Sequence, residues 1–319
     1  MMSKVAGCEP LQNDVSPKTT RIGWIGTGIM GAPMAAHLLA AGYSVAVYNR
    51  SSDKANELLA AGALWCDSPA CVAQQSDIVF SMVGYPRDVE EVVLGSNGLR
   101  TGWQAERNPK IVDTDHDRQR VFVDMTTSSP DLAESLARTL LQDNIVALDA
   151  PVSGGDRGAR EASLSIMVGG DHDVFTRLMP LWQCLGKQIV WQGGPGAGQA
   201  TKMVNQILIA NTINGVCEAI LYAQNCGLDL TRVFQSVAGG AAGSWQLTNL
   251  GPKIVDQDYE PGFMILHFVK DMTIALEESK KMGISLPGLE QVKQKYEQAI
   301  RAGYERLGTQ ALIRTMRSE

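Results

Sequence analysis

Residues 21–31 read Arg21-Ile22-Gly23-Trp24-Ile25-Gly26-Thr27-Gly28-Ile29-Met30-Gly31. The first five residues form a short apolar run, typical of a strand buried on both faces of a parallel sheet. The next six form the pattern G-x-G-x-x-G, and helical sequence follows as far as Ala41. In such a unit the first glycine makes the tight turn, the second lets a pyrophosphate approach the backbone, and the third lets helix pack on strand.

This arrangement predicts a dinucleotide site of the Rossmann type, with the pyrophosphate at the helix N-terminus. A glycine-rich turn without a ligand is the simpler alternative. The residues expected to bind the cofactor here are Gly26, Thr27, Gly28, Ile29 and Met30.

The second strand, 44–48, ends in Asn49-Arg50-Ser51, where NAD enzymes carry an acid for the ribose 2′-hydroxyl. This chain has an arginine between two small polar residues instead. A guanidinium pairs with a 2′-phosphate, whereas a carboxylate would repel it. All three residues are therefore expected to contact cofactor, with NADP(H) preferred and NAD(H) possible. If Arg50 only stacks on adenine as a solvated loop residue, both cofactors remain usable.

Helix and strand patterns then alternate up to residue 191. Helices are expected at 54–61, 69–75, 86–94, 131–142 and 174–185, and strands at 63–66, 77–83, 121–125, 145–152 and 188–191. Val83 and Gly84 close the strand 77–83 at the carboxyl edge, where the cofactor should pass.

Residues 100–120 interrupt this alternation with charges of both signs, which predicts a solvated loop insertion. Asp113, Asp115, His116 and Asp117 could hold a metal, but no partner ligands follow at useful spacing. No metal site is therefore expected.

Two polar turns follow later strands. The hydroxyls of Thr126-Thr127-Ser128-Ser129-Pro130 can face nicotinamide or substrate, or simply cap the next helix; Thr127 is expected in the site, while Ser129 before Pro130 suits helix capping. Ser153-Gly154-Gly155 offers a hydroxyl and backbone N–H groups to an anion such as a substrate carboxylate. A tight turn without a ligand is the alternative there.

Strand patterns stop after residue 191, and residues 199–226 read as one long helix followed by shorter ones. The chain is therefore expected to contain a disordered tail (1–20), an NAD(P)-binding Rossmann domain (21–193) and an all-helical substrate and dimerisation domain (194–319). The fold class is an α/β parallel-sheet domain followed by an all-α domain, joined by a long interdomain helix.

Lys202 and Asn205 share one face near the start of the long helix. The helix dipole and burial both disfavour an ammonium there, so the lysine pKa can fall toward neutrality, as acid–base chemistry requires. An exposed lysine is the plain alternative. On the helix 263–282, His267, Lys270 and Asp271 share a face. This face either carries a surface ion pair or closes over the cofactor end of the site, and His267 is interpreted as a packing residue.

Composition limits the function classes. The 319 residues are 45% hydrophobic with a net charge of −6, so nucleic acid is not an expected partner. No apolar run approaches the ~20 residues of a membrane span. Residues 1–20 resemble neither a signal nor a transit peptide, and the six cysteines form no C-x-x-C pair. A cytoplasmic location is expected, and an organellar one stays open.

Four stretches together resemble the β-hydroxyacid dehydrogenase family: 25–34, 149–155, 193–205 and Lys270-Asp271. The resemblance implies a Rossmann domain, a helical domain and homodimers or homotetramers. It also implies roles for single residues. Lys202 would be catalytic; Ser153, Gly154, Gly155, Asn205, Phe263 and Asp271 would bind substrate; Thr127 and Lys270 would touch the cofactor.

The resulting hypothesis is an oxidoreductase that interconverts a small 3-hydroxy acid and its semialdehyde by hydride transfer to or from NAD(P). The alternatives are an NADPH-dependent glyoxylate or succinic semialdehyde reductase, and a non-catalytic NADP-binding scaffold.

Overall fold

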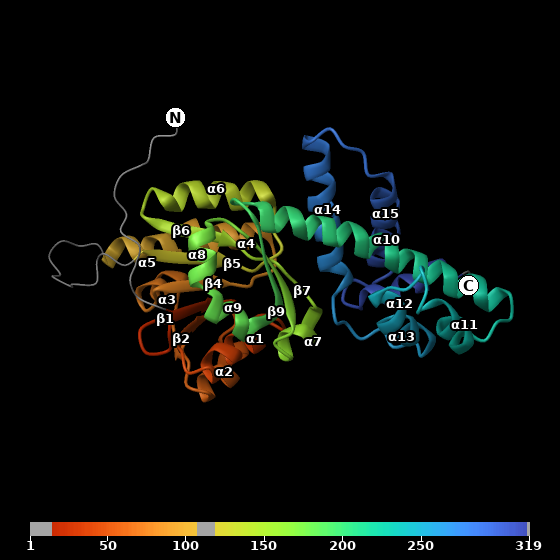
Figure 1. Ribbon diagram of the computed structural model, residues 1–319, viewed down its shortest axis with the longest axis horizontal. Coiled ribbons are helices and arrows are strands. Elements are labelled where there is room, and N and C mark those ends of the chain that lie inside the picture. Colours follow the sequence, from red (N-terminus) through yellow and green to blue (C-terminus); the bar gives the residue numbers. More distant parts are fainter. Residues whose placement is uncertain (1–14, 107–118, 318–319) are drawn as a thin grey trace.

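The computed structural model describes residues 15–106 and 119–317. Figure 1 shows an α/β domain beside a helical domain, with helix α10 (Ala197–Asn225) running from the first into the second. The predicted fold class is confirmed. The 29 residues of α10 span roughly 43 Å at the usual rise per residue, enough to contribute to both domains.

The described residues of the first domain form one nine-stranded sheet in the order β3-β2-β1-β4-β5-β6-β8-β7, with β9 paired to β8. Pairing is parallel from β3 to β6, antiparallel where β8 meets β6 and β7, and parallel again between β8 and β9. The strands are β1 (Arg21–Ile25), β2 (Ser44–Tyr48), β3 (Leu64–Trp65), β4 (Ile78–Ser81), β5 (Arg120–Asp124), β6 (Ile145–Asp149), β7 (Val152–Ser153), β8 (Leu164–Gly169) and β9 (Gly186–Gly193).

The chain order of the sheet reverses at β1, which pairs with β2 on one side and β4 on the other. In open parallel sheets a ligand binds outside the carboxyl ends of the strands at such a switch point. The turn that begins at Gly26 leaves β1 there. The topology therefore brings the turns after β1, β2 and β4 to one edge.

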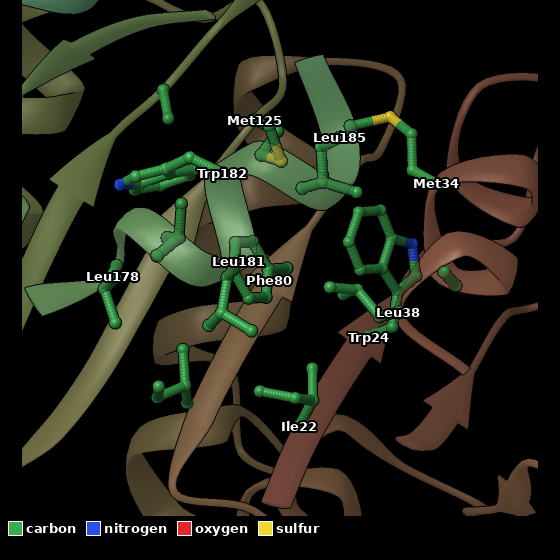
Figure 2. Packing of buried hydrophobic residues seen from close by; sticks show 14 of the residues in the cluster. Ile22, Trp24, Met34, Leu38, Phe80, Met125, Leu178, Leu181, Trp182 and Leu185 are labelled. Carbon is green, nitrogen blue, oxygen red and sulfur yellow. The ribbon is translucent and has the colours of Figure 1, made fainter. Parts of the chain in front are cut away.

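The central strands β1, β4 and β5 are buried on both faces of the sheet, and alternate residues of each strand belong to opposite cores. Trp24 stacks on Phe80 at a centroid distance of 5.4 Å, and Phe80 meets Trp182 edge to face at 5.9 Å. Figure 2 shows this cluster, with Leu181 and Leu185 packed on the strands. The continuous apolar runs of the strands follow from this two-sided burial.

Helices cover the two faces. The first-domain helices are α1 (Gly31–Ala40), α2 (Asn56–Ala60), α3 (Pro69–Gln74), α4 (Pro86–Leu94), α5 (Leu99–Glu106), α6 (Pro130–Leu141), α7 (Gly155–Arg160), α8 (His172–Arg177) and α9 (Met179–Leu185). Two expectations were wrong. Residues 100–106 belong to α5, where Trp103 is buried, and are not a loop. The helix expected at 174–185 is two helices, with Pro180 in the first turn of the second.

The second domain packs around α10. Its core includes Ile213, Phe268 and Tyr296, and the Tyr296 hydroxyl donates a 2.8 Å hydrogen bond to the Thr309 carbonyl. The surrounding helices are α11 (Leu230–Val237), α12 (Trp245–Asn249), α13 (Gly251–Val255), α14 (Ile265–Lys281), α15 (Pro287–Arg301), the short η2 (Thr309–Leu312) and α16 (Ile313–Met316). Phe263 precedes α14, so the prediction that it belongs to that helix was wrong.

The acidic cluster at 113–117, where no metal site is expected, and residues 1–14 of the predicted tail lie outside the described residues. Residues 15–20 are described, and there the prediction of a disordered tail was wrong. Val15 packs against the core of the first domain, and Thr20 is buried. Among the described helices, none is both long and apolar enough to cross a membrane.

Candidate active site

The glycine turn after β1 has the geometry that a dinucleotide requires. Gly26 adopts a φ of +97°, and a Cβ on it would come within 2.2 Å of the Met82 carbonyl oxygen. A Cβ on Gly31 would come within 1.9 Å of the Gly26 carbonyl oxygen, whereas one on Gly28 would meet nothing within 4 Å. The outer glycines allow close packing, and the middle one faces open space.

The side chain of Thr27 adds to this fit. Its hydroxyl is buried and has no hydrogen-bond partner among the described residues, while its N–H donates 3.1 Å to Asn49 Oδ1. A buried hydroxyl without a partner is costly unless a ligand pairs with it. The turn therefore fits a bound pyrophosphate, which Gly28 and Thr27 would face. Ile29, the next residue after Gly28, is exposed, and Met30 directly precedes α1.

The turn after β2 carries the residues predicted for the adenosine end. Asn49 ties it to the glycine turn, because its Nδ2 also donates 2.9 Å to the Ser51 carbonyl. Arg50 is 80% exposed, and its Nη1 lies 3.4 Å from Oδ1 of Asp88, in the first turn of α4. Arg50 is therefore paired with the carboxylate of Asp88, and the sequence around residue 50 does not predict this contact.

The turns after β4 and β5 are joined to each other. The N–H of Val83 donates a 3.0 Å hydrogen bond to the hydroxyl of Thr126, which ties the Val83-Gly84 turn to the loop at Thr127. Lys270 Nζ, from α14 of the other domain, donates 2.6 Å to the Thr127 carbonyl. The structure thus places Thr127 and Lys270 together, at the boundary between the domains.

Two polar side chains attach the start of α10 to the sheet. Asp149, at the end of β6, accepts 2.8 Å hydrogen bonds from the N–H groups of Gly196 and Gln199, and so caps the helix. Burial raises the pKa of Asp149, against the lowering effect of these bonds. The buried Gln199 amide donates 2.7 Å to the Thr126 carbonyl and accepts 2.9 Å from the Ser128 N–H.

Lys202 lies in the second turn of α10 and is only 6% exposed. Its Nζ donates 2.7 Å to the carbonyl of Val152. Burial lowers the lysine pKa to about 8; the charge of Asp271 opposes this shift and that of Lys270 adds to it. An amine with this pKa can gain or lose a proton near neutrality. The alternative of an exposed lysine is excluded.

A chain of hydrogen bonds runs beside Lys202. Asn205 Nδ2 donates 2.8 Å to Gln206 Oε1, and Gln206 Nε2 donates 2.5 Å to Asp271 Oδ2. Lys270 Nζ lies 3.1 Å from the other Asp271 oxygen. Gln206 and Asp271 are buried, and the hydrogen bonds and ion pair that they make are stronger in such a low-dielectric environment than in water. The interpretation of Lys270 and Asp271 as a surface pair is therefore wrong.

The turn predicted for a substrate carboxylate follows Val152 directly. Gly154 and Gly155 adopt φ values of +135° and +62°, which favour glycine, and Gly155 begins α7. The turn faces the other domain, since a Cβ on Gly155 would lie 3.5 Å from the Gly262 carbonyl oxygen. The ring of Phe263 packs edge to face on Phe268.

His267 packs across the domain boundary, with its ring 5.8 Å from that of Tyr85. Burial, with the charge of Lys270, lowers its pKa. These contacts agree with its interpretation as a packing residue.

Sequence reasoning missed Gln199, Gln206 and the cap by Asp149. A signal for the two glutamines exists, because residues 199, 202 and 206 are spaced three and four apart and so share one helix face. Polar residues that share a helix face with a candidate catalytic lysine are themselves candidate site residues. The Asp149 cap has no such local signal, since 47 residues separate Asp149 from Gly196.

Comparison with known proteins adds two matching families. The NAD-binding domain of 6-phosphogluconate dehydrogenase matches residues 21–193. The family described as "NAD-binding of NADP-dependent 3-hydroxyisobutyrate dehydrogenase" matches residues 196–316. The two matches meet at the start of α10.

Relatives match over nearly the full chain. "Probable 3-hydroxyisobutyrate dehydrogenase-like 1, mitochondrial" of Arabidopsis thaliana is 44% identical over 94% of this chain and 86% of its own length. The 2-hydroxy-3-oxopropionate reductase of Escherichia coli is 38% identical over 93% and 97%. The structure of 3-hydroxyisobutyrate dehydrogenase from Mycobacterium tuberculosis, 27% identical, superposes with a TM-score of 0.82 over 94% of this chain and 99% of that one.

Proposed function

The chain belongs to the β-hydroxyacid dehydrogenase family, and we propose that Lys202 is its general acid and base in the interconversion of a small 3-hydroxy acid and its semialdehyde. The chain is an NAD(P)-dependent oxidoreductase that acts on a CH–OH group. The observation that supports the role of Lys202 is its buried amine, of pKa about 8, beside the Ser153–Gly155 turn.

Lys202 handles the proton of the reaction. In oxidation its neutral amine takes the proton of the substrate hydroxyl, and in reduction its ammonium gives a proton to the carbonyl oxygen. Its positive charge also stabilises the alkoxide that develops between these states. A nicotinamide cofactor held by the glycine turn would exchange a hydride with the carbon that bears this oxygen.

The proposed substrate site combines the two domains. Ser153, Gly154 and Gly155 bind the substrate carboxylate through the serine hydroxyl and backbone N–H groups. Asn205 and Asp271 orient the rest of the substrate, held in turn by Gln206. Phe263 is proposed to bind substrate from the family resemblance alone.

For the cofactor, the binding of a nicotinamide dinucleotide follows from the family, and we propose a preference for NADP(H). The support is Arg50 in the place where NAD enzymes carry an acid. The proposed contacts are those of Gly26, Thr27, Gly28, Ile29, Met30, Asn49, Arg50, Ser51, Val83, Gly84, Thr127 and Lys270.

We propose a homodimer or homotetramer as the functional assembly. The exposed side of α10 carries the apolar residues Val204, Leu208 and Tyr222, the last of them 73% exposed. An exposed apolar stripe of this kind is typical of a subunit interface.

A specific observation also favours the second candidate, an NADPH-dependent glyoxylate or succinic semialdehyde reductase, because Arg50 suits the cofactor used for reduction. One assay separates these candidates. Oxidation of NADPH and of NADH is followed with glyoxylate, succinic semialdehyde, methylmalonate semialdehyde and tartronate semialdehyde. Turnover of methylmalonate semialdehyde or tartronate semialdehyde supports the first function, and turnover of only glyoxylate or succinic semialdehyde supports the second. Tight cofactor binding with no turnover would leave the non-catalytic scaffold.

A further inference from the structure

The contact between Arg50 and Asp88 joins two elements on opposite sides of β1. Arg50 follows β2, and Asp88 lies near the start of α4, which follows β4. Because β2 and β4 are the two neighbours of β1, the pair meets at the switch point of the sheet. In such folds the adenosine ribose lies at this end of the cofactor site, where the residue after β2 faces its 2′ substituent.

The two partners are unequal. The Arg50 side chain is 80% exposed, whereas that of Asp88 is only 14% exposed. Gly84 lies behind the carboxylate, since a Cβ there would come within 3.2 Å of Asp88 Oδ2. The arginine therefore has room to turn toward a ligand, whereas the carboxylate is packed among protein atoms.

One oxygen of Asp88 has no hydrogen bond. Oδ1 faces Arg50, but Oδ2 is buried and unpartnered within the described part of the chain. A carboxylate oxygen buried in this way lacks a donor, and a ribose hydroxyl is a donor that this position offers. Asp88 is therefore an acid, carried by α4, that lies beside the Asn49-Arg50-Ser51 turn, which has none.

We propose that Asp88 is a specificity-determining residue for the cofactor and limits the preference for NADP(H) that Arg50 confers. Its carboxylate accepts a hydrogen bond from the 2′-hydroxyl of NAD(H), and it repels a 2′-phosphate while competing with that phosphate for Arg50. The inference rests on the proposed function only in placing the adenosine ribose between these residues.

If Asp88 had a purely structural role, substituting it would have different effects. An acid in the first turn of a helix stabilises the helix by interacting with its dipole. Such a role changes the stability of the protein, and it changes the affinities for both cofactors by the same factor. The ratio of the two affinities therefore separates specificity from helix stabilisation.

The experiment measures the dissociation constants of NADPH and NADH by isothermal titration calorimetry for the wild type and for Asp88→Asn. The matched control is Glu90→Gln, which removes the same charge from an exposed position of the same helix. We expect Asp88→Asn to tighten NADPH binding and weaken NADH binding, moving the affinity ratio about five- to tenfold toward NADPH. The control should move it less than twofold, and added salt should shrink the effect on NADPH.

A ratio that stays within twofold in Asp88→Asn, or equal losses of both affinities, would overturn the inference. Arg50→Ala tests the proposed NADP preference separately, because it should weaken NADPH binding about tenfold with little effect on NADH. If Arg50→Ala leaves both affinities unchanged, the NADP preference is wrong. A shifted ratio in Asp88→Asn would still establish the role of the carboxylate.

Discussion

Lys202 Nζ donates a 2.7 Å hydrogen bond to the carbonyl of Val152, the residue directly before the Ser153-Gly154-Gly155 turn. The lysine belongs to the interdomain helix and the carbonyl to the edge of the sheet, so this bond fixes the proposed acid–base group relative to the proposed carboxylate site. The amine has further donor capacity, which leaves it able to bind a substrate oxygen as well.

The first prediction concerns the chemistry of this amine. Lys202→Met removes it and keeps an unbranched apolar side chain, so turnover should fall about 10²–10⁴-fold, the usual contribution of a general acid or base. Dissociation constants of the cofactor, measured by titration calorimetry, should change little. The control Lys187→Met removes an exposed lysine of β9 and should leave turnover unchanged. Turnover of Lys202→Met within tenfold of the wild type would refute the mechanism.

The second prediction is the pH dependence of turnover. The pKa of Lys202 is about 8, lowered from the usual 10.5 mainly by burial. Oxidation needs the neutral amine, so its kcat/KM should rise with pH and level off above about pH 8. Reduction needs the ammonium, so its kcat/KM should be highest below this pKa and fall above it. Initial rates in both directions between pH 6 and 10 test the opposite signs.

The third prediction changes this pKa through a neighbour. The charge of Asp271 raises the pKa of Lys202, in opposition to burial. Asp271→Asn removes that charge while keeping the shape, so the midpoint of both pH profiles should move to lower pH. A midpoint that stays in place, or moves up, would mean that Lys202 does not govern the profile.

A feature of the fold can be predicted from the sequence when neighbouring residues determine it, and is missed when remote contacts do. The glycine turn was predicted because strand, turn and helix follow one another within twenty residues. The helix α5 was missed because residues 100–120 were read as one charged window. Its helical part is held by remote contacts: Trp103 Nε1 donates 3.1 Å to the Ser76 carbonyl, and Arg100 pairs with Asp143 at 2.5 Å.

The same distinction applies to the site. The burial of Lys202 was expected from the apolar helix around it, and its effect on the pKa has the expected sign. The partners of the site residues were not predicted, because Asp149, Thr126 and Asp88 come from other parts of the sheet edge. Which backbone groups a buried carboxylate meets is decided by packing across the sheet, which one sequence does not encode in any short pattern.

The fourth prediction tests the cap on the interdomain helix. Asp149→Ala leaves the N–H groups of Gly196 and Gln199 buried without an acceptor, so the free energy of unfolding should fall by about 2–4 kcal/mol. Turnover should fall as well, because the helix that carries Lys202 loses its anchor. Urea denaturation and kcat are the measurements.

Asp171→Ala is the matched control, since Asp171 caps the short helix α8 through the N–H of Val174. It should cost about 1 kcal/mol of stability and leave kcat unchanged. If both substitutions affect stability but neither affects kcat, the Asp149 cap does not position Lys202.

The fifth prediction separates folding from cofactor binding at the glycine turn. A methyl group on Gly28 meets no protein atom within 4 Å, so Gly28→Ala should fold with a melting temperature close to that of the wild type. The same methyl group occupies the space through which the pyrophosphate approaches the backbone, so the dissociation constants of NADPH and NADH should both rise at least about tenfold.

Two further substitutions serve as comparisons for Gly28→Ala. Gly31→Ala forces a methyl group against the Gly26 carbonyl oxygen, so it should lower the melting temperature together with cofactor affinity. Gly239→Ala, at an exposed position with equally open space, should change neither quantity. The contrast matters because loss of affinity alone is ambiguous in a protein that unfolds. Unchanged affinity in a well-folded Gly28→Ala protein would mean that the pyrophosphate does not lie over this turn.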